Sequence, residues 1–152
     1  MHHLPRRVTG FPPAGVLMVV AGIVCGGCGS DQLPTAPVEG KVLYQGKPLE
    51  FGSVIFQPDV GPPARGTISS DGTFRLSTYG NGDGAVIGRH LVRIACFESQ
   101  DPAAPPLKPN EEPTMGRSLI PRKYNNPGTS GLRVEVKPQN EPFVFECVGE
   151  AR

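Results

Sequence analysis

The chain has 152 residues and a formal net charge of +1, and 38% of its residues are apolar, including 7 Phe and 3 Tyr but no Trp. This length accommodates one domain with a short appendage. No basic patch stands out in the sequence, so the electrostatic signature of nucleic-acid binding is missing and we expect no nucleic-acid partner. The 20 glycines and 18 prolines fall between short apolar runs, as turns do in an all-β protein.

Residues 1–27 have the pattern of a signal peptide. The first residues contain Arg6 and Arg7 and no acid, and residues 14–24 form an uninterrupted apolar run. A membrane-spanning helix needs about 20 apolar residues, whereas the hydrophobic region of a signal peptide needs about 7–15. We therefore expect residues 1–27 to form a signal-peptide helix that directs export.

Two cysteines close this segment, in the order Cys25-Gly-Gly-Cys28-Gly. The junction resembles the lipobox of bacterial lipoproteins, in which a cysteine that follows small residues is acylated and begins the mature chain. Cys28 fits the pattern because Gly26 and Gly27 precede it, whereas the β-branched Val24 precedes Cys25. The resemblance implies lipidation of Cys28, with Cys25 as the weaker alternative, and attachment to a membrane by acyl chains. An unlipidated secretory signal and an uncleaved anchor are the other two interpretations.

Strands and turns follow in chain order. Residues 28–37 are polar and contain two prolines, a composition typical of a flexible tether. The pair Asp71-Gly72 between two apolar runs predicts a β-hairpin, because glycine adopts a positive φ without steric cost. We expect a domain at residues 38–148 and a tail at 149–152, with strands at 38–44, 53–57, 64–69, 73–78, 89–97, 132–137 and 143–148.

Apolar residues alternate along the expected strands, and helical periodicity is absent outside the signal. Strands with one apolar face bury it by packing two sheets together. The pattern therefore predicts an all-β domain, a seven-stranded antiparallel β-sandwich. The glycine-rich segment 79–88 and the proline-rich segment 98–116 predict exposed loops.

Several short motifs recur in a known order. They are V-x-G-x-V from Val38, G-K-P-L at 46–49, D-G before F-x-L at 71–76, P-x-K-Y at 121–124 and T-S-G-L at 129–132. Together they resemble the carboxypeptidase-regulatory-like, transthyretin-like β-sandwich found in many small bacterial lipoproteins. The resemblance implies a seven-stranded Greek-key sandwich, related to Ig-like sandwiches, and implies little about activity. An enzymatic relative, the transthyretin-like hydrolase of purine catabolism, ends in Tyr-Arg-Gly-Ser, which this chain lacks.

Catalytic and metal-binding patterns are also missing from the sequence. His90 is the only histidine after the signal, and alternation places it on the inward face of its strand. Nucleophilic catalysis needs a nucleophile with a base in reach, and the cysteine spacing does not match a zinc site. We therefore expect no enzyme, no cofactor and no metal. A pocket that gathered His90 with carboxylates, such as Asp83 or Glu98, would revive the enzyme interpretation.

Cys96 and Cys147 both fall on the predicted core face, near strand ends. In an oxidising, exported compartment they could form a disulfide. As free thiols they would pack as small apolar residues. The sequence leaves both alternatives open, because it does not fix the register of the strands.

These observations predict a membrane-tethered, non-enzymatic binding or interaction module outside the cytoplasm, in the periplasm or at the cell surface. An envelope protein or a polysaccharide would be its partner. The alternatives are a structural envelope lipoprotein without a ligand and a hydrolase of the transthyretin-like type. Rigid sandwiches present function on loops, so loops 79–88 and 98–127 are the candidate surface, with Tyr79, Arg122, Lys123 and Tyr124 as exposed contacts.

Overall fold

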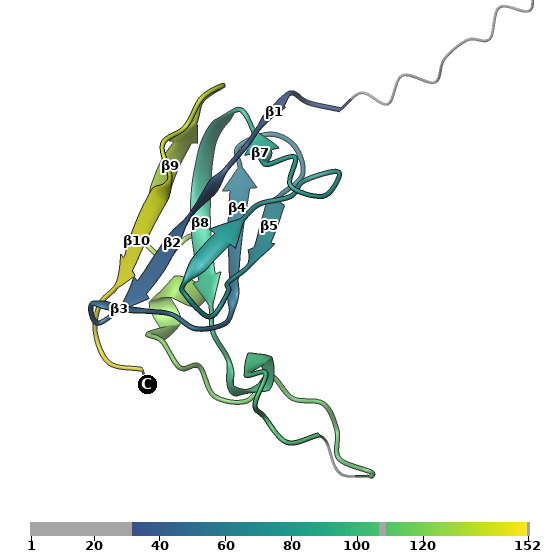
Figure 1. Cartoon of the computed structure of the whole chain (residues 1–152), viewed down its shortest axis with the longest axis vertical. Helices are drawn as coiled ribbons and strands as arrows, with labels where there is room; N and C mark the ends of the chain where they lie inside the picture. Colours follow the sequence, from purple (N-terminus) through teal and green to yellow (C-terminus); the bar gives the residue numbers. More distant parts are fainter. Residues whose placement is uncertain (1–31, 107–108, 152) are drawn as a thin grey trace, which may run out of the picture. The chain divides into compact units, whose positions relative to one another are not determined.

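The computed structural model describes residues 32–106 and 109–151, which fold as an all-β domain without an α-helix in that part of the chain (Figure 1). The expected signal peptide and the lipidation residue Cys28 lie outside these ranges. Two four-stranded sheets and one two-stranded pair make up the domain. We refer to the four-stranded sheets as sheet I and sheet II.

Sheet I is antiparallel throughout, in the order β5-β4-β8-β9. Its long central strand, β8, alternates buried residues with outward-facing ones, which is the pattern of a sheet with one face in the core. The strands are β5 (Ala64–Thr67), β4 (Ser53–Pro58), β8 (Gly88–Ala95) and β9 (Arg133–Val136).

Sheet II is built around β2 (Glu39–Tyr44). On one side β2 pairs with β3 (Lys47–Pro48) and β6 (Thr73–Arg75), and on the other with β10 (Phe143–Cys147). The β2–β10 pairing is parallel. The expectation of antiparallel pairing throughout is therefore wrong here, because an alternating pattern specifies which face is buried but not the direction of the neighbouring strand.

A short pair, β1 (Thr35–Ala36) with β7 (Ala85–Val86), lies at the end of the domain where β2 begins. Two expectations are therefore wrong at these residues: β1 lies within the segment expected to be a flexible tether, and β7 lies within the expected loop 79–88. The described part of the tether, residues 32–37, is fixed because Ala36 is buried and Pro34 accepts a 3.0 Å hydrogen bond from the backbone of Ile87. The ordered domain thus begins before Val38.

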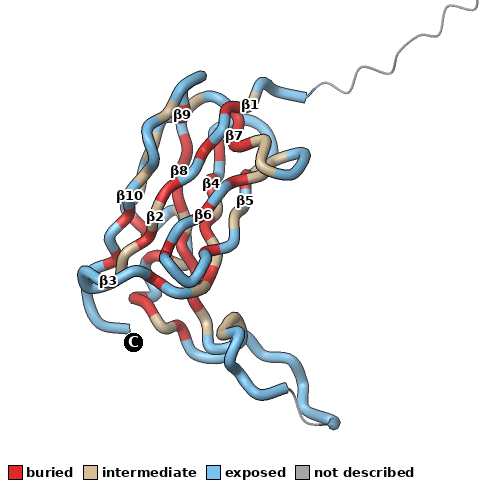
Figure 2. The backbone as a smooth tube through the Cα atoms, in the orientation of Figure 1, coloured by how far each residue is buried: buried red, intermediate tan, exposed pale blue. Residues whose placement is uncertain are grey.

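The core lies between the two sheets (red in Figure 2). Phe56 of sheet I contacts three aromatic rings of sheet II, those of Phe74, Phe143 and Phe145, at centroid distances of 6.4, 5.7 and 5.9 Å. Burial of one such side chain contributes about 1.5–3 kcal/mol. This aromatic cluster holds the sheets together.

All seven expected strands are present, with small differences at their ends. The strand expected at 73–78 ends at Arg75. The Leu76 N–H still bonds to the Val38 carbonyl, in register with the β2–β6 pair, but Ser77 pairs with Arg65 of sheet I instead. Two 3₁₀ turns, η1 (Glu98–Gln100) and η2 (Arg122–Asn125), complete the elements.

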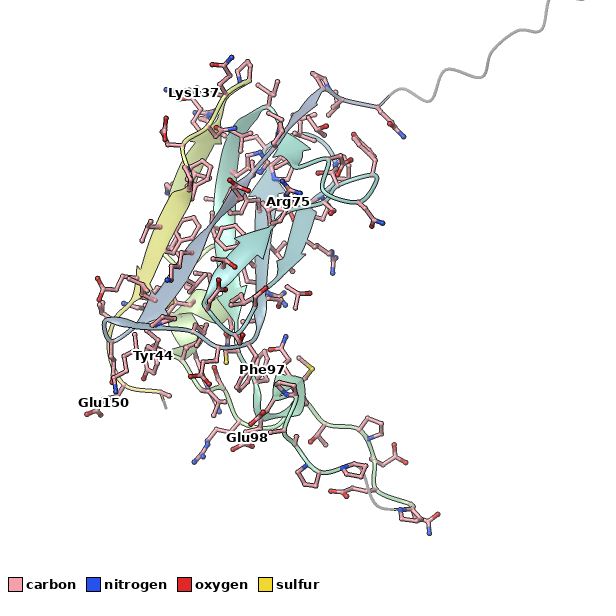
Figure 3. The ribbon with its side chains drawn as sticks, viewed as in Figure 1. Tyr44, Arg75, Phe97, Glu98, Lys137 and Glu150 are labelled. Atoms are coloured by element: carbon pink, nitrogen blue, oxygen red, sulfur yellow. The ribbon has the colours of Figure 1, made fainter. Side chains whose placement is uncertain are left out.

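The loop expected at 98–116 is exposed along its described residues except the half-buried Gln100 and Asp101, and it projects from one end of the sandwich (Figures 1 and 3). Its base is fixed by Glu98 and Arg117. The Glu98 carboxylate accepts a hydrogen bond from the Arg117 backbone N–H at 2.9 Å, and its other oxygen lies 3.2 Å from the guanidinium. A rigid base therefore carries an irregular, proline-rich excursion.

Candidate functional site

Arginines occupy outward-facing positions on three of the four strands of sheet I. On β8, Arg89 and Arg93 alternate with the buried His90 and Val92. The outer face also carries one arginine from each edge strand. We call this surface the arginine face; its members are Arg65, Arg89, Arg93 and Arg133.

An open groove of about 420 Å³ crosses the arginine face. It extends from β8 over β4 and β5 to the end of β6, so that it gathers three guanidinium groups and three hydroxyl side chains. No Asp or Glu is among the described residues that form it. We call it the arginine groove; it is lined by Ser53, Ile55, Arg65, Gly66, Thr67, Arg75, Ser77 and Arg93.

Strand register determines the arrangement of the groove. Ile55 of β4 lies opposite Arg65 on one side and opposite Arg93 on the other. Neighbouring strands are about 4.8 Å apart, which places the two arginine Cα atoms about 10 Å from each other across Ile55. Arg65 also exchanges backbone hydrogen bonds of 2.9 Å with Ser77, and this contact brings the β6 residue Arg75 to the same groove.

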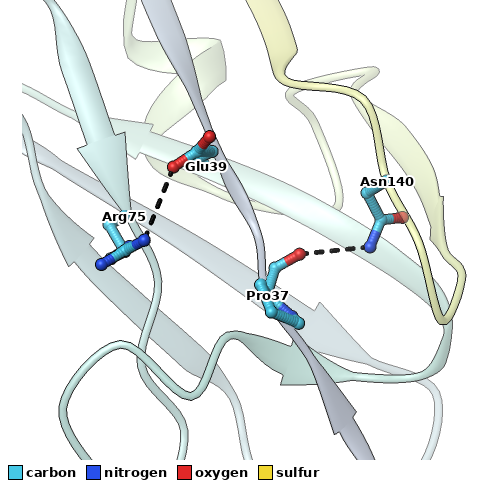
Figure 4. A network of polar contacts seen from close by, with 4 residues as sticks. All are labelled: Pro37, Glu39, Arg75 and Asn140. Atoms are coloured by element: carbon cyan, nitrogen blue, oxygen red, sulfur yellow. Dashed lines mark hydrogen bonds and ion pairs between the residues drawn. The ribbon is translucent and has the colours of Figure 1, made fainter.

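The positive charge of the arginine groove is poorly balanced. Arg75 forms one long ion pair, 3.8 Å, with Glu39 on the surface (Figure 4). Neither Arg65 nor Arg93 forms an ion pair among the residues that the structure describes. The Nε atom of Arg93 is buried and has no hydrogen-bond partner in this part of the chain. A buried donor without a partner costs about 1–3 kcal/mol, so this nitrogen is an unfavourable feature of the folded surface.

A second groove of about 420 Å³ lies on the same face, between β8 and β9. Here the charges are balanced, because Arg89 pairs with Asp59 at 3.0 Å and also lies opposite Glu135 in the sheet. Arg133 is the exception in this groove, since none of the ion pairs among the described residues involves it. The arginine groove is therefore the more positive of the two.

The contacts expected from the sequence are not united in one place. Arg122 and Lys123 are exposed on η2, but Tyr124 is only 3% exposed, so its assignment as a surface contact is wrong. The Tyr124 hydroxyl accepts a 3.0 Å hydrogen bond from the Val148 backbone, which fixes the ring beneath the end of β10. The P-x-K-Y motif thus turns its aromatic ring into the core.

Tyr79 lies at the other end of the sandwich. Its hydroxyl accepts a 3.0 Å hydrogen bond from the backbone of Leu33, next to β1 and β7. η2 is instead near the C-terminal end of β10, which pairs with the opposite end of β2 (Figure 1). Tyr79 and η2 therefore do not form one surface.

The second groove brings His90 together with two carboxylates, those of Asp59 and Glu135, whereas Asp83 and Glu98 are not among its described lining residues. His90 is only 2% exposed there, and the Asp59 carboxylate is paired with Arg89 at 3.0 Å. His90 is buried against Phe56, and its Nε2 donates a 2.6 Å hydrogen bond to the Val86 carbonyl. The Glu98 carboxylate is engaged by Arg117. The Asp83 carboxylate accepts hydrogen bonds from three backbone N–H groups of residues 78–80; burial opposes its ionisation, but these donors lower its pKa overall. Asp83 thus stabilises the turn of the glycine-rich loop.

Cys96 and Cys147 are both buried in the core as free thiols. Burial raises the pKa of Cys96 to about 11 and that of Cys147 to about 12. Because the thiolate is the nucleophilic form, neither thiol is reactive at neutral pH while the domain is folded. Formation of a bridge between them stays a prediction.

Residues 32–106 and 109–151 contain no group of three His, Cys, Asp or Glu side chains that could hold a metal ion. Within the same ranges no helix is long and apolar enough to cross a membrane. The polar feature that remains is the arginine groove. Sequence reasoning missed it, although Arg65, Arg75 and Arg93 each occupy an outward position of an expected strand.

Comparison with known proteins found no matching family model, no matching curated protein and no matching solved structure.

Proposed function

We propose that this chain is an exported lipoprotein whose β-domain is a non-enzymatic binding module, tethered to a membrane and displayed in the periplasm or at the cell surface. The observation that carries the proposal is the arginine groove. It presents three guanidinium groups on a rigid sheet surface, and two of them form no ion pair in the described part of the chain.

Binding explains this groove better than a purely structural role does. Arg65 and Arg93 flank the same residue, Ile55, so their like charges lie on one small area of the sheet. Two like charges about 10 Å apart repel each other weakly in water, and an anion held between them would be attracted by both. A structural envelope protein gains nothing from this arrangement, whereas a module with an anionic ligand can use it.

We further propose the transthyretin-like, Greek-key family of sandwiches for the domain, with one parallel strand pair. Three of its motifs have a physical role in the fold. A Cβ atom at Gly40, in V-x-G-x-V, would collide with the Phe143 carbonyl and the Phe74 ring. Gly46, in G-K-P-L, adopts φ +77° in the turn between β2 and β3. Ser130, in T-S-G-L, donates a 2.6 Å hydrogen bond to the Val92 carbonyl.

The tether is tested on the full chain extracted from membranes. We expect an intact mass equal to that of residues 28–152 plus acyl chains, and we expect Cys28→Ser to abolish the acyl mass and release the protein from the membrane. Cys25→Ser is the matched control and should keep both. A soluble, unacylated wild-type product would contradict the lipoprotein assignment.

The binding function is tested with the same full chain, purified in a non-ionic detergent. The polysaccharide fraction of the producing cell's envelope is titrated against wild type, Arg65→Ala/Arg93→Ala and Lys47→Ala/Lys137→Ala. The two lysines are exposed and lie outside the arginine groove, so the second double variant loses the same charge elsewhere. Binding that the arginine variant loses and the lysine variant keeps would support the proposal. Equal binding by all three proteins would contradict it.

A further inference from the structure

The residues of the arginine groove also indicate which chemical class of ligand it binds. This inference rests on the proposed function, that is, on the groove being the binding site. We infer that the groove binds tetrahedral phosphate groups, and that its natural ligand is a polymer that carries them at intervals.

The charge of the groove favours a phosphate over a carboxylate. Three guanidinium groups line it, and no carboxylate is among the described lining residues. A carboxylate has two oxygens in one plane and is satisfied by a single bidentate arginine. A phosphate offers oxygens in several directions, so it can accept from arginines on opposite sides at once.

The arrangement around Ile55 provides such opposite donors. Arg65 and Arg93 approach from the two neighbouring strands, and the apolar Ile55 side chain lies between them as the floor. A phosphate above Ile55 would be within reach of both guanidinium groups.

Hydroxyl groups supply further donors at the edge of the groove. Ser77 Oγ accepts a 2.8 Å hydrogen bond from the Gly82 backbone, and Ser53 Oγ accepts a longer one of 3.4 Å from Gln100. Because each oxygen acts as an acceptor in these bonds, its own hydroxyl proton is available to an anion. Thr67 lies directly opposite Ser53 and adds a third hydroxyl.

The shape of the arginine face favours a polymer over a single ion. The groove is open along the sheet, and the second groove continues the same face toward β9. Arg133 of the second groove lies opposite Leu91, two residues before Arg93 on β8. A chain with successive phosphates could therefore contact Arg65 and Arg93 with one group and Arg133 with the next.

The test uses the full chain in non-ionic detergent and four probes, titrated by calorimetry. Inorganic phosphate represents the free ion, glycerophosphoglycerol a lipid headgroup without acyl chains, polyphosphate a phosphate polymer, and polyglutamate a carboxylate polymer. We expect polyphosphate to bind most tightly of the four probes, and we expect its affinity to fall as the salt concentration is raised. The double variant Arg65→Ala/Arg93→Ala should lower the affinity for polyphosphate by about tenfold or more. The double variant Lys47→Ala/Lys137→Ala should leave this affinity nearly unchanged.

Arg93→Lys separates charge from geometry, because lysine keeps the charge but loses the bidentate fork. We expect this variant to weaken polyphosphate binding while its thermal unfolding stays that of wild type. Tighter binding of glycerophosphoglycerol than of polyphosphate would support the phosphate chemistry but assign its source to a lipid headgroup. Polyglutamate binding as tight as that of polyphosphate, or equal losses in the arginine and lysine double variants, would overturn the inference.

Failure of this inference is distinguishable from failure of the proposed function. If the envelope polysaccharide binds through Arg65 and Arg93 but no phosphate probe does, the proposed binding function is supported and the inference of a phosphate ligand is wrong. If neither the polysaccharide nor any phosphate probe depends on these arginines, both proposals fail.

Discussion

The ring of Phe56 on β4 meets the ring of Phe145 on β10 edge to face, with centroids 5.9 Å apart and an interplanar angle of 77°. The two residues belong to different sheets, and both are buried. Edge-to-face pairs add about 0.5–1.5 kcal/mol to the effect of burial alone. This contact therefore links the parallel β2–β10 pair of sheet II to the centre of sheet I.

Phe56→Ala should lower the free energy of unfolding by about 3–5 kcal/mol, because it removes the ring that contacts three phenylalanine rings of sheet II and leaves a cavity. Urea denaturation of the full chain in detergent measures the change. Val144→Ala is the control: it lies on β10 but is 66% exposed, so its effect should stay within about 0.5 kcal/mol. A loss below about 1 kcal/mol for Phe56→Ala would show that the sheets do not pack through this cluster.

The strands of this domain were predictable because each buries one face, and alternation of apolar residues records which face it is. The direction of β10 relative to β2 was not predictable, because Phe143, Phe145 and Cys147 would alternate identically in a parallel and an antiparallel pair. Burial of Tyr124 was also missed. The sequence around it is typical of a loop, but the ring belongs to the core and its hydroxyl bonds to the chain at the end of β10.

The arginine groove could not be predicted for a related reason. Arg65, Arg75 and Arg93 are far apart in the sequence, and each looks like an ordinary outward residue of a half-buried strand. Register alone makes them neighbours, and a shift of one residue would turn a side chain to the other face. The outward phase of each arginine was thus visible in the sequence, but their convergence was not.

Tyr124→Phe should destabilise the domain by about 0.5–1.5 kcal/mol, because it deletes the hydroxyl that accepts from the Val148 backbone at 3.0 Å. Amide hydrogen exchange should become faster at Val148. Tyr44→Phe is matched to it: the Tyr44 hydroxyl donates to Gly149 at 3.2 Å in an exposed position, so its loss should matter less. Equal effects of the two variants would contradict the structural role assigned to Tyr124.

The Asp71 carboxyl should titrate at a lower pH than an ordinary aspartate. Its pKa is lowered first by the Thr73 hydroxyl, which donates at 2.6 Å, and then by the Thr73 backbone N–H at 3.0 Å. Because the folded pKa is depressed, this stabilisation is present above the unfolded value of about 3.9 and is lost as pH falls through the folded pKa.

NMR titration of the Asp71 side chain checks this prediction directly. Thr73→Val should raise the Asp71 pKa toward its ordinary value, since only the backbone donor remains. Thr114→Val, in the exposed loop, removes a hydroxyl that has no part in this turn and should leave the Asp71 pKa unchanged. An Asp71 pKa that does not respond to Thr73→Val would show that the turn is held by other contacts.

The reduced protein should lose stability in alkaline solution through its two core thiols. Burial raises the pKa of Cys96 to about 11 and that of Cys147 to about 12, whereas both ionise near about 8.5 in the unfolded chain. The unfolded state therefore releases protons first. The contribution of these thiols is complete below about pH 8.5 and is lost as pH rises toward the folded values.

Urea denaturation from pH 7 to pH 10 should show a steeper loss of stability for the reduced wild type than for Cys96→Ala/Cys147→Ala. Both proteins keep their other ionisable groups, so the difference between the two slopes isolates the buried thiols. If the reduced wild type loses no more stability between pH 7 and pH 10 than the double variant, the two cysteines are not free, buried thiols in the folded protein. Alkylation is measured separately on protein that has not been reduced: if Cys96 and Cys147 take up alkyl groups only after a reducing agent is added, the two residues are bridged by a disulfide.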